Sequence, residues 1–259
     1  MLDVICWLWR PTRTYRSQFS PRHVNALREM VARHYPHPHR FSCITDQTEG
    51  FDPEVRILPL WDDHRSRQSI YGPDTPACYP RLKAFSKEMR EFIGPRFISL
   101  DLDVCIVRDV TPIFNRTEDF LIWGVRGRRT PWNGSMWMMN AGAREHVWTR
   151  FNDNPEKAVS RARGAGFYGS DQAWMNYVLG PNENCWSDAD GVYSFRMNIK
   201  PNRGHLPNDA RIVFFEGHYD PWNPVTQQHC PWLKDHYPLL RSNQQHSVPD
   251  AAVEAASPS

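Results

Sequence analysis

The chain has 259 residues, of which 40% are hydrophobic and 23% are charged, and its formal net charge is +2. This composition is that of a globular protein, and the length suits one substantial domain, which we expect over residues 1–242. The near-balanced charge excludes a chain that is cationic enough overall to bind polyanions through its net charge alone.

The cysteines and the first residues bear on the compartment. Six cysteines are scattered without a C-x-x-C pair, and Cys6, Cys43 and Cys105 lie in apolar runs, where a free thiol behaves as a small core side chain. This pattern favours a reducing, cytoplasmic environment. The segment MLDVICWLWR contains Asp3 and no basic leader, which predicts a strand rather than a signal peptide. No apolar run is long enough to span a bilayer.

Short apolar runs alternate with helical patterns along the chain. In chain order, strands are expected at Val4–Trp9, Phe41–Thr45, Val55–Leu60, Arg96–Leu100, Phe120–Val125, Met136–Asn140 and Arg211–Phe215. Helices are expected from Pro21 to His34 after a Ser20 cap, through Leu82 to Phe92, and at Glu145–Phe151, Pro155–Arg163 and Asp171–Leu179. The alternation predicts an α/β sandwich with a mostly parallel central sheet. Residues 243–259 lack periodicity and are expected to be disordered.

Two aspartates follow the apolar run Phe97–Leu100, namely Asp101 and Asp103. On extended backbone, alternate side chains point to the same side, so these carboxylates can converge. Two anions held together repel each other unless a cation or a raised pKa relieves them, and Mg²⁺ and Mn²⁺ commonly sit between protein carboxylates and substrate phosphates. The pair therefore predicts a metal–diphosphate site at the carboxyl ends of the strands. The alternative is two solvated aspartates after an edge strand.

Two helix starts carry polar residues of chemical interest. Arg81 and Lys83 stand at the beginning of a predicted helix, where both the helix N-terminus and the cations favour an anionic ligand. Asp171 and Gln172 stand in the first turn of another helix. Exposed charges and ordinary helix capping are the alternative explanations.

Three other segments could contact ligands. Asn133 to Met136 precede a strand that ends in Asn140-Ala141-Gly142, where small residues let a ligand approach, and ordinary turns are the alternative. Glu216 and His218 leave the last strand and could complete a metal shell, although a single histidine more often has a structural role. Arginines cluster at residues 126–129 and 161–163, which are either solvated loops or a landing site for phosphates or an anionic acceptor.

Taken in order, these segments resemble the GT-A glycosyltransferases, most closely the glycogenin-like and lipopolysaccharide-galactosyltransferase branch with its bacterial and phage relatives. The resemblance spans about Val4 to Trp222. The segments that carry it are the first strand–helix–strand unit ending in Thr45-Asp46, LDLDV, MMNAG, GSDQAWMNYVL and FFEGHYDPW. It implies the GT-A (Rossmann-like) nucleotide-sugar-binding sandwich and a transferase that is usually retaining.

The resemblance also implies ligands and site residues. The donor would be a nucleotide sugar, with a uridine diphosphate sugar favoured, and Mn²⁺ or Mg²⁺ would bridge its diphosphate and the aspartate pair. The donor-binding residues would be Trp9, Arg10, Asp46, Arg81, Lys83, Asp101, Leu102, Asn133 and Arg196. The metal ligands would be Asp101, Asp103, Glu216 and His218. The catalytic residues, which contact the transferred sugar and acceptor, would be Asp171 and Gln172.

The closing segment departs from the family pattern. When it is aligned on Pro221-Trp222, the usual metal-binding histidine becomes Glu216, with His218 two residues away as a substitute. The usual diphosphate-binding lysine becomes Asp220, which cannot neutralise a diphosphate, so Arg196 or Lys200 is expected to take over that charge.

Other functions remain open at this point. The segment ISLDLDVCIV also fits a haloacid-dehalogenase-like phosphatase, although that family carries its motif on the first strand. A nucleotide-sugar binding module without catalysis is a second alternative. Within the transferase interpretation, a saccharide or lipid-linked sugar is the favoured acceptor, and a modified base in nucleic acid is the other.

Overall fold

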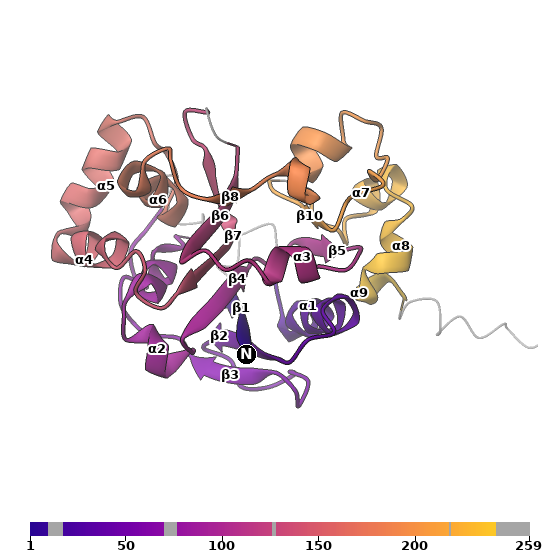
Figure 1. Cartoon of the computed structure of the whole chain (residues 1–259), viewed down its shortest axis with the longest axis horizontal. Helices are drawn as coiled ribbons and strands as arrows, with labels where there is room; N and C mark the ends of the chain where they lie inside the picture. Colours follow the sequence, from indigo (N-terminus) through magenta and orange to yellow (C-terminus); the bar gives the residue numbers. More distant parts are fainter. Residues whose placement is uncertain (10–17, 70–76, 126–127, 218, 242–259) are drawn as a thin grey trace, which may run out of the picture.

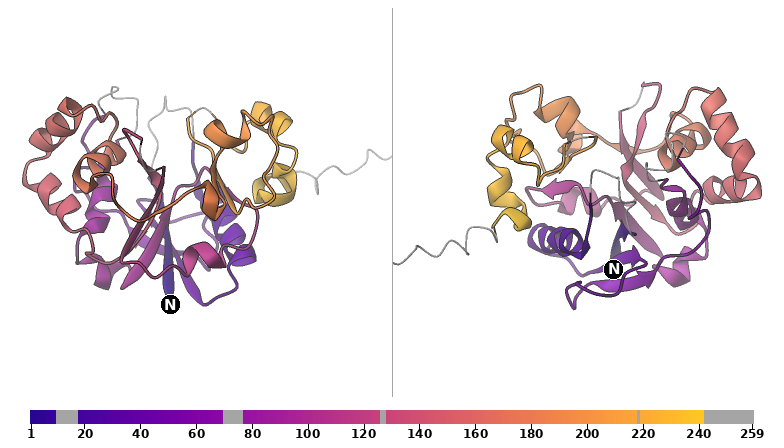
Figure 2. Two further views of the ribbon diagram at one scale, coloured as in Figure 1. Left: turned by 45° about the horizontal axis from the view of Figure 1, so that its top comes forward. Right: turned by 180° about the vertical axis from the view of Figure 1, so that it is seen from behind.

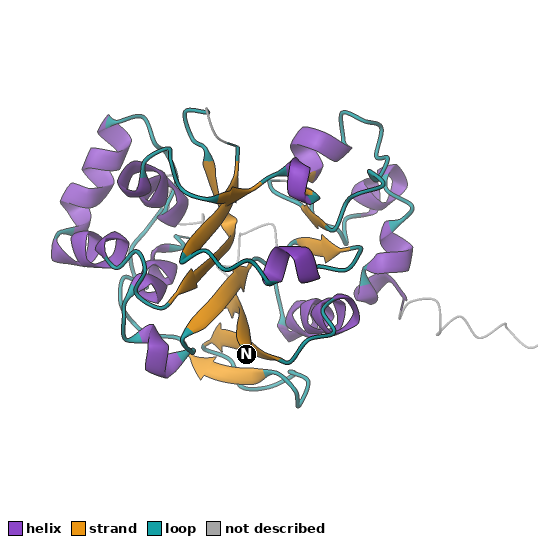
Figure 3. Cartoon of the chain, in the orientation of Figure 1, coloured by secondary structure: helices purple, strands orange, loops and turns teal. Residues whose placement is uncertain are grey.

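The computed structural model describes residues 1–9, 18–69, 77–125, 128–217 and 219–241 (Figure 1). The predicted disordered tail at 243–259 and the candidate residues Arg10 and His218 lie outside these ranges. Helices flank a central sheet on both sides (Figure 3). No helix within the described ranges is long and apolar enough to cross a membrane.

The central sheet has seven strands in the order β3-β2-β1-β4-β7-β6-β8. Their bounds are β1 Leu2–Leu8, β2 His39–Thr45, β3 Arg56–Pro59, β4 Arg96–Leu100, β6 Phe120–Gly124, β7 Trp132–Asn140 and β8 Cys185–Trp186. Among these strands, only β7 runs antiparallel to its neighbours. The expected α/β architecture with a mostly parallel sheet is confirmed.

Strand β1 shows why this sheet is central. All seven of its residues are buried, as expected for a strand covered on both faces. Because alternate side chains point to opposite faces, Val4 and Cys6 enter one core cluster while Ile5 and Trp7 enter the other. The first cluster packs under α1 (Pro21–His34), and the second packs under α4 (His146–Asp153), α5 (Pro155–Gly164) and α6 (Asp171–Leu179).

The flanking helices divide into two groups. Helices α4 (His146–Asp153), α5 (Pro155–Gly164) and α6 (Asp171–Leu179) cover one side of the sheet. Helices α1, α7 (Pro224–His229), α8 (Leu233–His236) and α9 (Pro238–Arg241) lie on the other side (Figure 2). Further helical segments are α3 (Thr111–Phe114), the 3₁₀ turn η2 (Asp188–Asp190) and the π-helix η3 (Phe195–Ile199).

The helix expected through Leu82 to Phe92 is wrong as a single element. The structure has a 3₁₀ helix, η1 (Tyr79–Phe85), followed by a short helix, α2 (Met89–Phe92). Ser86 between them is extended, and its hydroxyl accepts a hydrogen bond from the Glu88 N–H at 3.3 Å. Such a local bond competes with the helical hydrogen-bond ladder, which explains the interruption.

A small second sheet follows the order β5-β10-β9. Its strands are β5 Val104–Ile106, β9 Val192–Ser194 and β10 Ile212–Phe214. Strand β10 pairs antiparallel with β5 and parallel with β9. The strand expected at Arg211–Phe215 is therefore confirmed, but it belongs to a separate sheet that the sequence analysis did not predict.

His23 in α1 is enclosed by aromatic side chains. Its ring centroid lies 4.4 Å from that of Trp222 and 5.7 Å from that of Phe19. Its Nδ1 accepts a hydrogen bond from the Ser20 N–H at 3.0 Å, which requires a ring that is unprotonated at this atom. Burial lowers the pKa of His23 to about 4.

This environment predicts acid sensitivity. Because the folded pKa lies below the unfolded value of about 6.5, the contribution of His23 is complete above pH 6.5 and is lost as pH falls towards 4. The free energy of unfolding is expected to lose about 3 kcal/mol over this range. His23→Gln keeps an acceptor for Ser20 without a titrating ring. Urea unfolding at several pH values should show a smaller loss in the variant, whereas an equal loss in both proteins would contradict the prediction.

Candidate active site

The aspartate pair lies in the bend that joins β4 to β5. The Asp101 N–H donates to the carbonyl of Ser135 at 2.9 Å, which continues the contact with β7. The carbonyl of Asp103 accepts from the Phe215 N–H at 2.8 Å, which begins the contact with β10. The sequence analysis expected the two aspartates to share one extended strand, and the structure shows that they do not. They bridge the two sheets at the carboxyl end of β4.

Arg81 holds Asp101 and Asp171 together from inside the protein. Its Nη1 lies 2.9 Å from Asp101 and its Nε lies 3.4 Å from Asp171, while Nη2 donates to the carbonyl of Gly134. Burial alone would lower the pKa of Arg81, but the charges of the two carboxylates raise it. Arg81 is 6% exposed, so it fixes these carboxylates rather than presenting a free charge to a ligand.

Asp103 lies close to three other acids, Asp101, Asp220 and Glu216. Burial, followed by the charges of Asp101, Asp220 and Glu216, raises the pKa of Asp103 well above its usual value. The pairing of Val104 with Phe214 explains this proximity, because it brings the residue before β5 next to the residues after β10. Four carboxylates therefore concentrate negative charge at one end of the small sheet.

Glu216 is held by the hydroxyl of Ser194, which lies 2.7 and 2.8 Å from its two oxygens. Within the described part of the chain, no three His, Cys, Asp or Glu side chains are grouped closely enough to form a metal centre on their own. The candidate ligand His218 falls outside that part. The predicted metal shell of Asp101, Asp103 and Glu216 thus stays a prediction.

A cavity of about 240 Å³ lies beside these residues. It is lined by Asn133, Gln172, Arg196 and Glu216 among others. The Gln172 Oε1 accepts from the Gly134 N–H at 3.0 Å, so its amide nitrogen is the part of the side chain that can donate to a ligand. The structure therefore brings the predicted catalytic residue Gln172, two predicted donor contacts and one predicted metal ligand to one cavity.

The start of β7 lies near the carboxyl end of β4, and the end of β7 lies near the amino end of β4. Because β7 is antiparallel to β4, Asn140 pairs with Arg96 at the start of β4, whereas Met136 pairs with Leu100 at its end. The segment Asn140-Ala141-Gly142 was expected to lie where a ligand approaches. It lies at the end of the sheet away from the aspartate pair, so that expectation is wrong. Asn133 lies at the same end as the aspartate pair.

Other predicted donor residues occupy varied positions. Trp9 and Asp46 follow the paired strands β1 and β2, at the same edge as Asp101, and Asp46 forms an ion pair with Arg65. The Leu102 side chain is 4% exposed in the core, so only its backbone could contact a donor.

Lys83 points to a different group of residues. Its ammonium lies 2.6 Å from Asp63 and about 6 Å from the ring centroids of Trp61 and Trp148. It is not joined to the aspartate pair as Arg81 is. Lys200 donates to the hydroxyl of Tyr219.

Asp220 and Ser194 contribute to the site but were not predicted as part of it. Asp220 is buried, and its charge acts on Asp103, although the sequence marked it only as a departure from the family pattern. Ser194 ends a three-residue strand in an irregular region, so no periodic signal could have identified it.

Comparison with solved structures finds glycosyltransferases. The galactosyltransferase LgtC, solved with donor and acceptor sugar analogs, matches with a TM-score of 0.61 at 12% identity over 96% of this chain and 98% of LgtC. GlyE of Streptococcus pneumoniae matches with a TM-score of 0.55 at 10% identity, over 88% of this chain and 60% of GlyE. The bifunctional glycosyltransferase WbbM matches with a TM-score of 0.54 at 10% identity, over 94% of this chain and 51% of WbbM.

The chain has the GT-A fold. This confirms the fold that the motif resemblance implied. No protein-family model and no curated protein matches the sequence. The GT-A fold also disfavours the phosphatase alternative, because that family carries its aspartate pair on the first strand, whereas here the pair follows β4.

Proposed function

We propose that this protein is a glycosyltransferase that moves a sugar from a nucleotide-diphosphate donor, with a uridine diphosphate sugar favoured, to a hydroxyl acceptor, with a saccharide favoured. The observation that carries the proposal is the junction of Asp101 and Asp171 through Arg81, beside Asp103 and Gln172. The GT-A fold and the donor and acceptor analogs bound to LgtC support it.

The acids around Asp103 are the candidate ligands of a hard divalent cation. Burial and then the charges of the neighbouring acids raise the pKa of Asp103, and a diphosphate would add further negative charge. Because these side chains do not form a metal centre on their own, Asp101, Asp103 and Glu216 would hold Mn²⁺ or Mg²⁺ together with the oxygen atoms of the diphosphate, since these cations prefer oxygen ligands. The bound cation would supply neutralisation of the charge on the diphosphate.

The protein's own residues would position the reacting groups. Arg81 keeps Asp171 at a fixed place although burial raises the pKa of this carboxyl group. The amide nitrogen of Gln172 would donate to the transferred sugar or acceptor, and Arg196 on the cavity wall would attract the leaving phosphates. We include retention of the anomeric configuration in the proposal, on the basis of the family resemblance.

A thermal-shift series of nucleotide sugars with and without Mn²⁺ tests the proposal. A ligand at one hundred times its dissociation constant stabilises a protein by about 2.7 kcal/mol, which corresponds to several degrees of melting temperature. We expect this stabilisation only when a uridine diphosphate sugar and Mn²⁺ are both present, and uridine serves as the control without a diphosphate. Slow donor hydrolysis would then separate an enzyme from a binding module. If no nucleotide sugar stabilises the protein with either cation, the proposal is wrong.

A further inference from the structure

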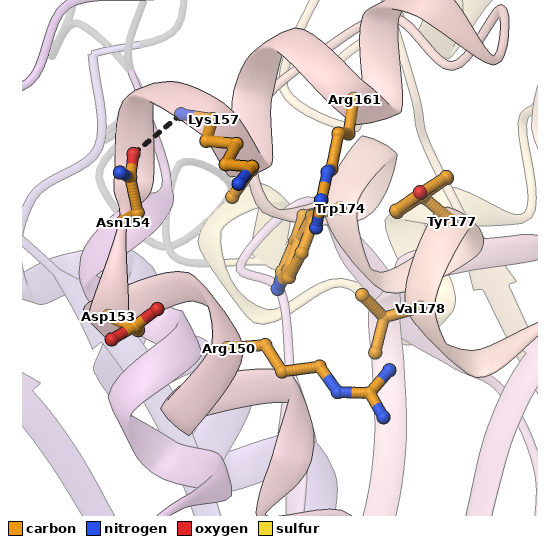
Figure 4. Close-up of a pocket in the computed structure, with 9 residues that line it drawn as sticks. Arg150, Asp153, Asn154, Lys157, Arg161, Trp174, Tyr177 and Val178 are labelled. Carbon is orange, nitrogen blue, oxygen red and sulfur yellow. Dashed lines mark hydrogen bonds between the residues drawn. The ribbon is translucent and has the colours of Figure 1, made fainter.

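A second concave site lies among α4, α5 and α6. Its volume is about 380 Å³, within the size range of cavities that bind small ligands. It shares no lining residue with the cavity beside Gln172 and Glu216. Figure 4 shows side chains from all three helices around it, so the site is formed by packed secondary structure rather than by a loop.

Three cations line this second site: Arg150 on α4, and Lys157 and Arg161 on α5. Neighbouring cations are neutralised, because Arg67 forms an ion pair with Glu156 at 2.7 Å and Arg144 with Glu183 at 2.9 Å. Within the described ranges, no ion pair neutralises the three cations of the site.

The spacing of these cations carries an energetic cost. Lys157 and Arg161 are four residues apart on one helix face, where like charges repel each other. One carboxylate, Asp153, also lines the site, so three positive charges face one negative charge. A ligand with a charge near −2 would balance the site and relieve the repulsion.

Aromatic rings from α6 form another part of the wall. The Trp174 indole is fixed by a hydrogen bond from Nε1 to the carbonyl of Val147 at 2.8 Å. The Tyr177 ring lies 5.6 Å from the indole between centroids, and this residue is 37% exposed. An exposed aromatic ring beside cations offers a surface on which a planar base can stack.

We propose that this second site binds a nucleotide unit. The base would stack on Tyr177, and the phosphate would lie against Arg150, Lys157 and Arg161. A phosphate monoester carries a charge of about −1.5 to −2 near neutral pH, which matches the excess positive charge of the site. The unit could be a free mononucleotide or part of a single strand, and the two sources share this chemistry.

Binding of AMP and of a fluorescent oligothymidylate to the full chain, at low ionic strength, tests the proposal. Lys157→Gln/Arg161→Gln is the site variant, and its fold should be retained because it removes a repulsion. Arg90→Gln/Lys234→Gln is the matched control, since it removes the same charge from exposed positions on α2 and α8. The site variant should weaken binding at least about tenfold, and the control less than about twofold.

Two further measurements distinguish the aromatic wall from the cations, and a free nucleotide from a single strand. Tyr177→Ala should weaken AMP binding about tenfold while leaving the binding of inorganic phosphate unchanged. Tighter binding of the oligothymidylate than of AMP would identify a strand, and the reverse order a free nucleotide. The proposal is overturned if neither probe binds saturably at millimolar concentration, if both double variants behave alike, or if uridine diphosphate with Mn²⁺ displaces AMP. None of these outcomes depends on sugar transfer.

Discussion

Asp103→Asn is expected to lower sugar transfer by about three orders of magnitude while the protein remains folded. Asparagine keeps the shape of the side chain but removes the charge that would hold the cation. Burial and the neighbouring acids Asp101, Asp220 and Glu216 disfavour the ionised form of Asp103, so the metal-free variant should melt at the same temperature as the parent protein or higher. Transfer of labelled sugar and thermal unfolding measure the two effects.

The cation dependence of melting provides a second readout for this variant. Mn²⁺ added together with a uridine diphosphate sugar should raise the melting temperature of the parent protein and have little effect on that of the variant. Asp62→Asn is the matched control, because the Asp62 side chain is 98% exposed, and it should retain transfer. Near-normal transfer by correctly folded Asp103→Asn would rule out the metal assignment.

Arg81→Gln is expected to reduce the free energy of unfolding by about 3–5 kcal/mol, since removing one partner of a buried ion pair leaves a carboxylate uncompensated. The Arg81 and Asp171 side chains are 8% and 7% exposed. Urea unfolding measures the loss. Adding Asp171→Asn to the variant should recover part of it, because the second substitution removes the unpaired charge.

Lys83→Gln is the control for this measurement. The Lys83–Asp63 pair is more exposed, at 23% and 33%, and such pairs contribute about 1 kcal/mol or less. Equal losses for Arg81→Gln and Lys83→Gln would show that the junction of Asp101 and Asp171 does not depend on Arg81.

The local patterns predicted the parts of the fold that depend on neighbouring residues. Buried apolar runs identified β1, β2 and β4, and Ser20 followed by Pro21 identified the start of α1. Such local patterns could not predict the direction in which a strand runs in the sheet. The segment after Met136 was recognised as a strand, but its antiparallel direction, which moves Asn140 away from the site, depends on pairing with β4.

The candidate site was predictable only in part for the same reason. Asp101 and Asp103 stood out because they are adjacent to a buried strand. The pairing of β5 with β10 joins Asp103 to Glu216 and Asp220 across more than one hundred residues. Strands of three residues give almost no periodic signal, so this long-range contact could not be inferred from local sequence.

Strand β10 follows all strands of the central sheet in the sequence, so the sheet can form before the acids around Asp103 are complete. All seven strands of the central sheet have been synthesised by Trp186, whereas Glu216 emerges thirty residues afterwards. A nascent polypeptide could therefore assemble its sheet around β1 while Asp103 still lacks its distant neighbours. Glu216 and Asp220 would then reach Asp103 only once β10 has paired with β5.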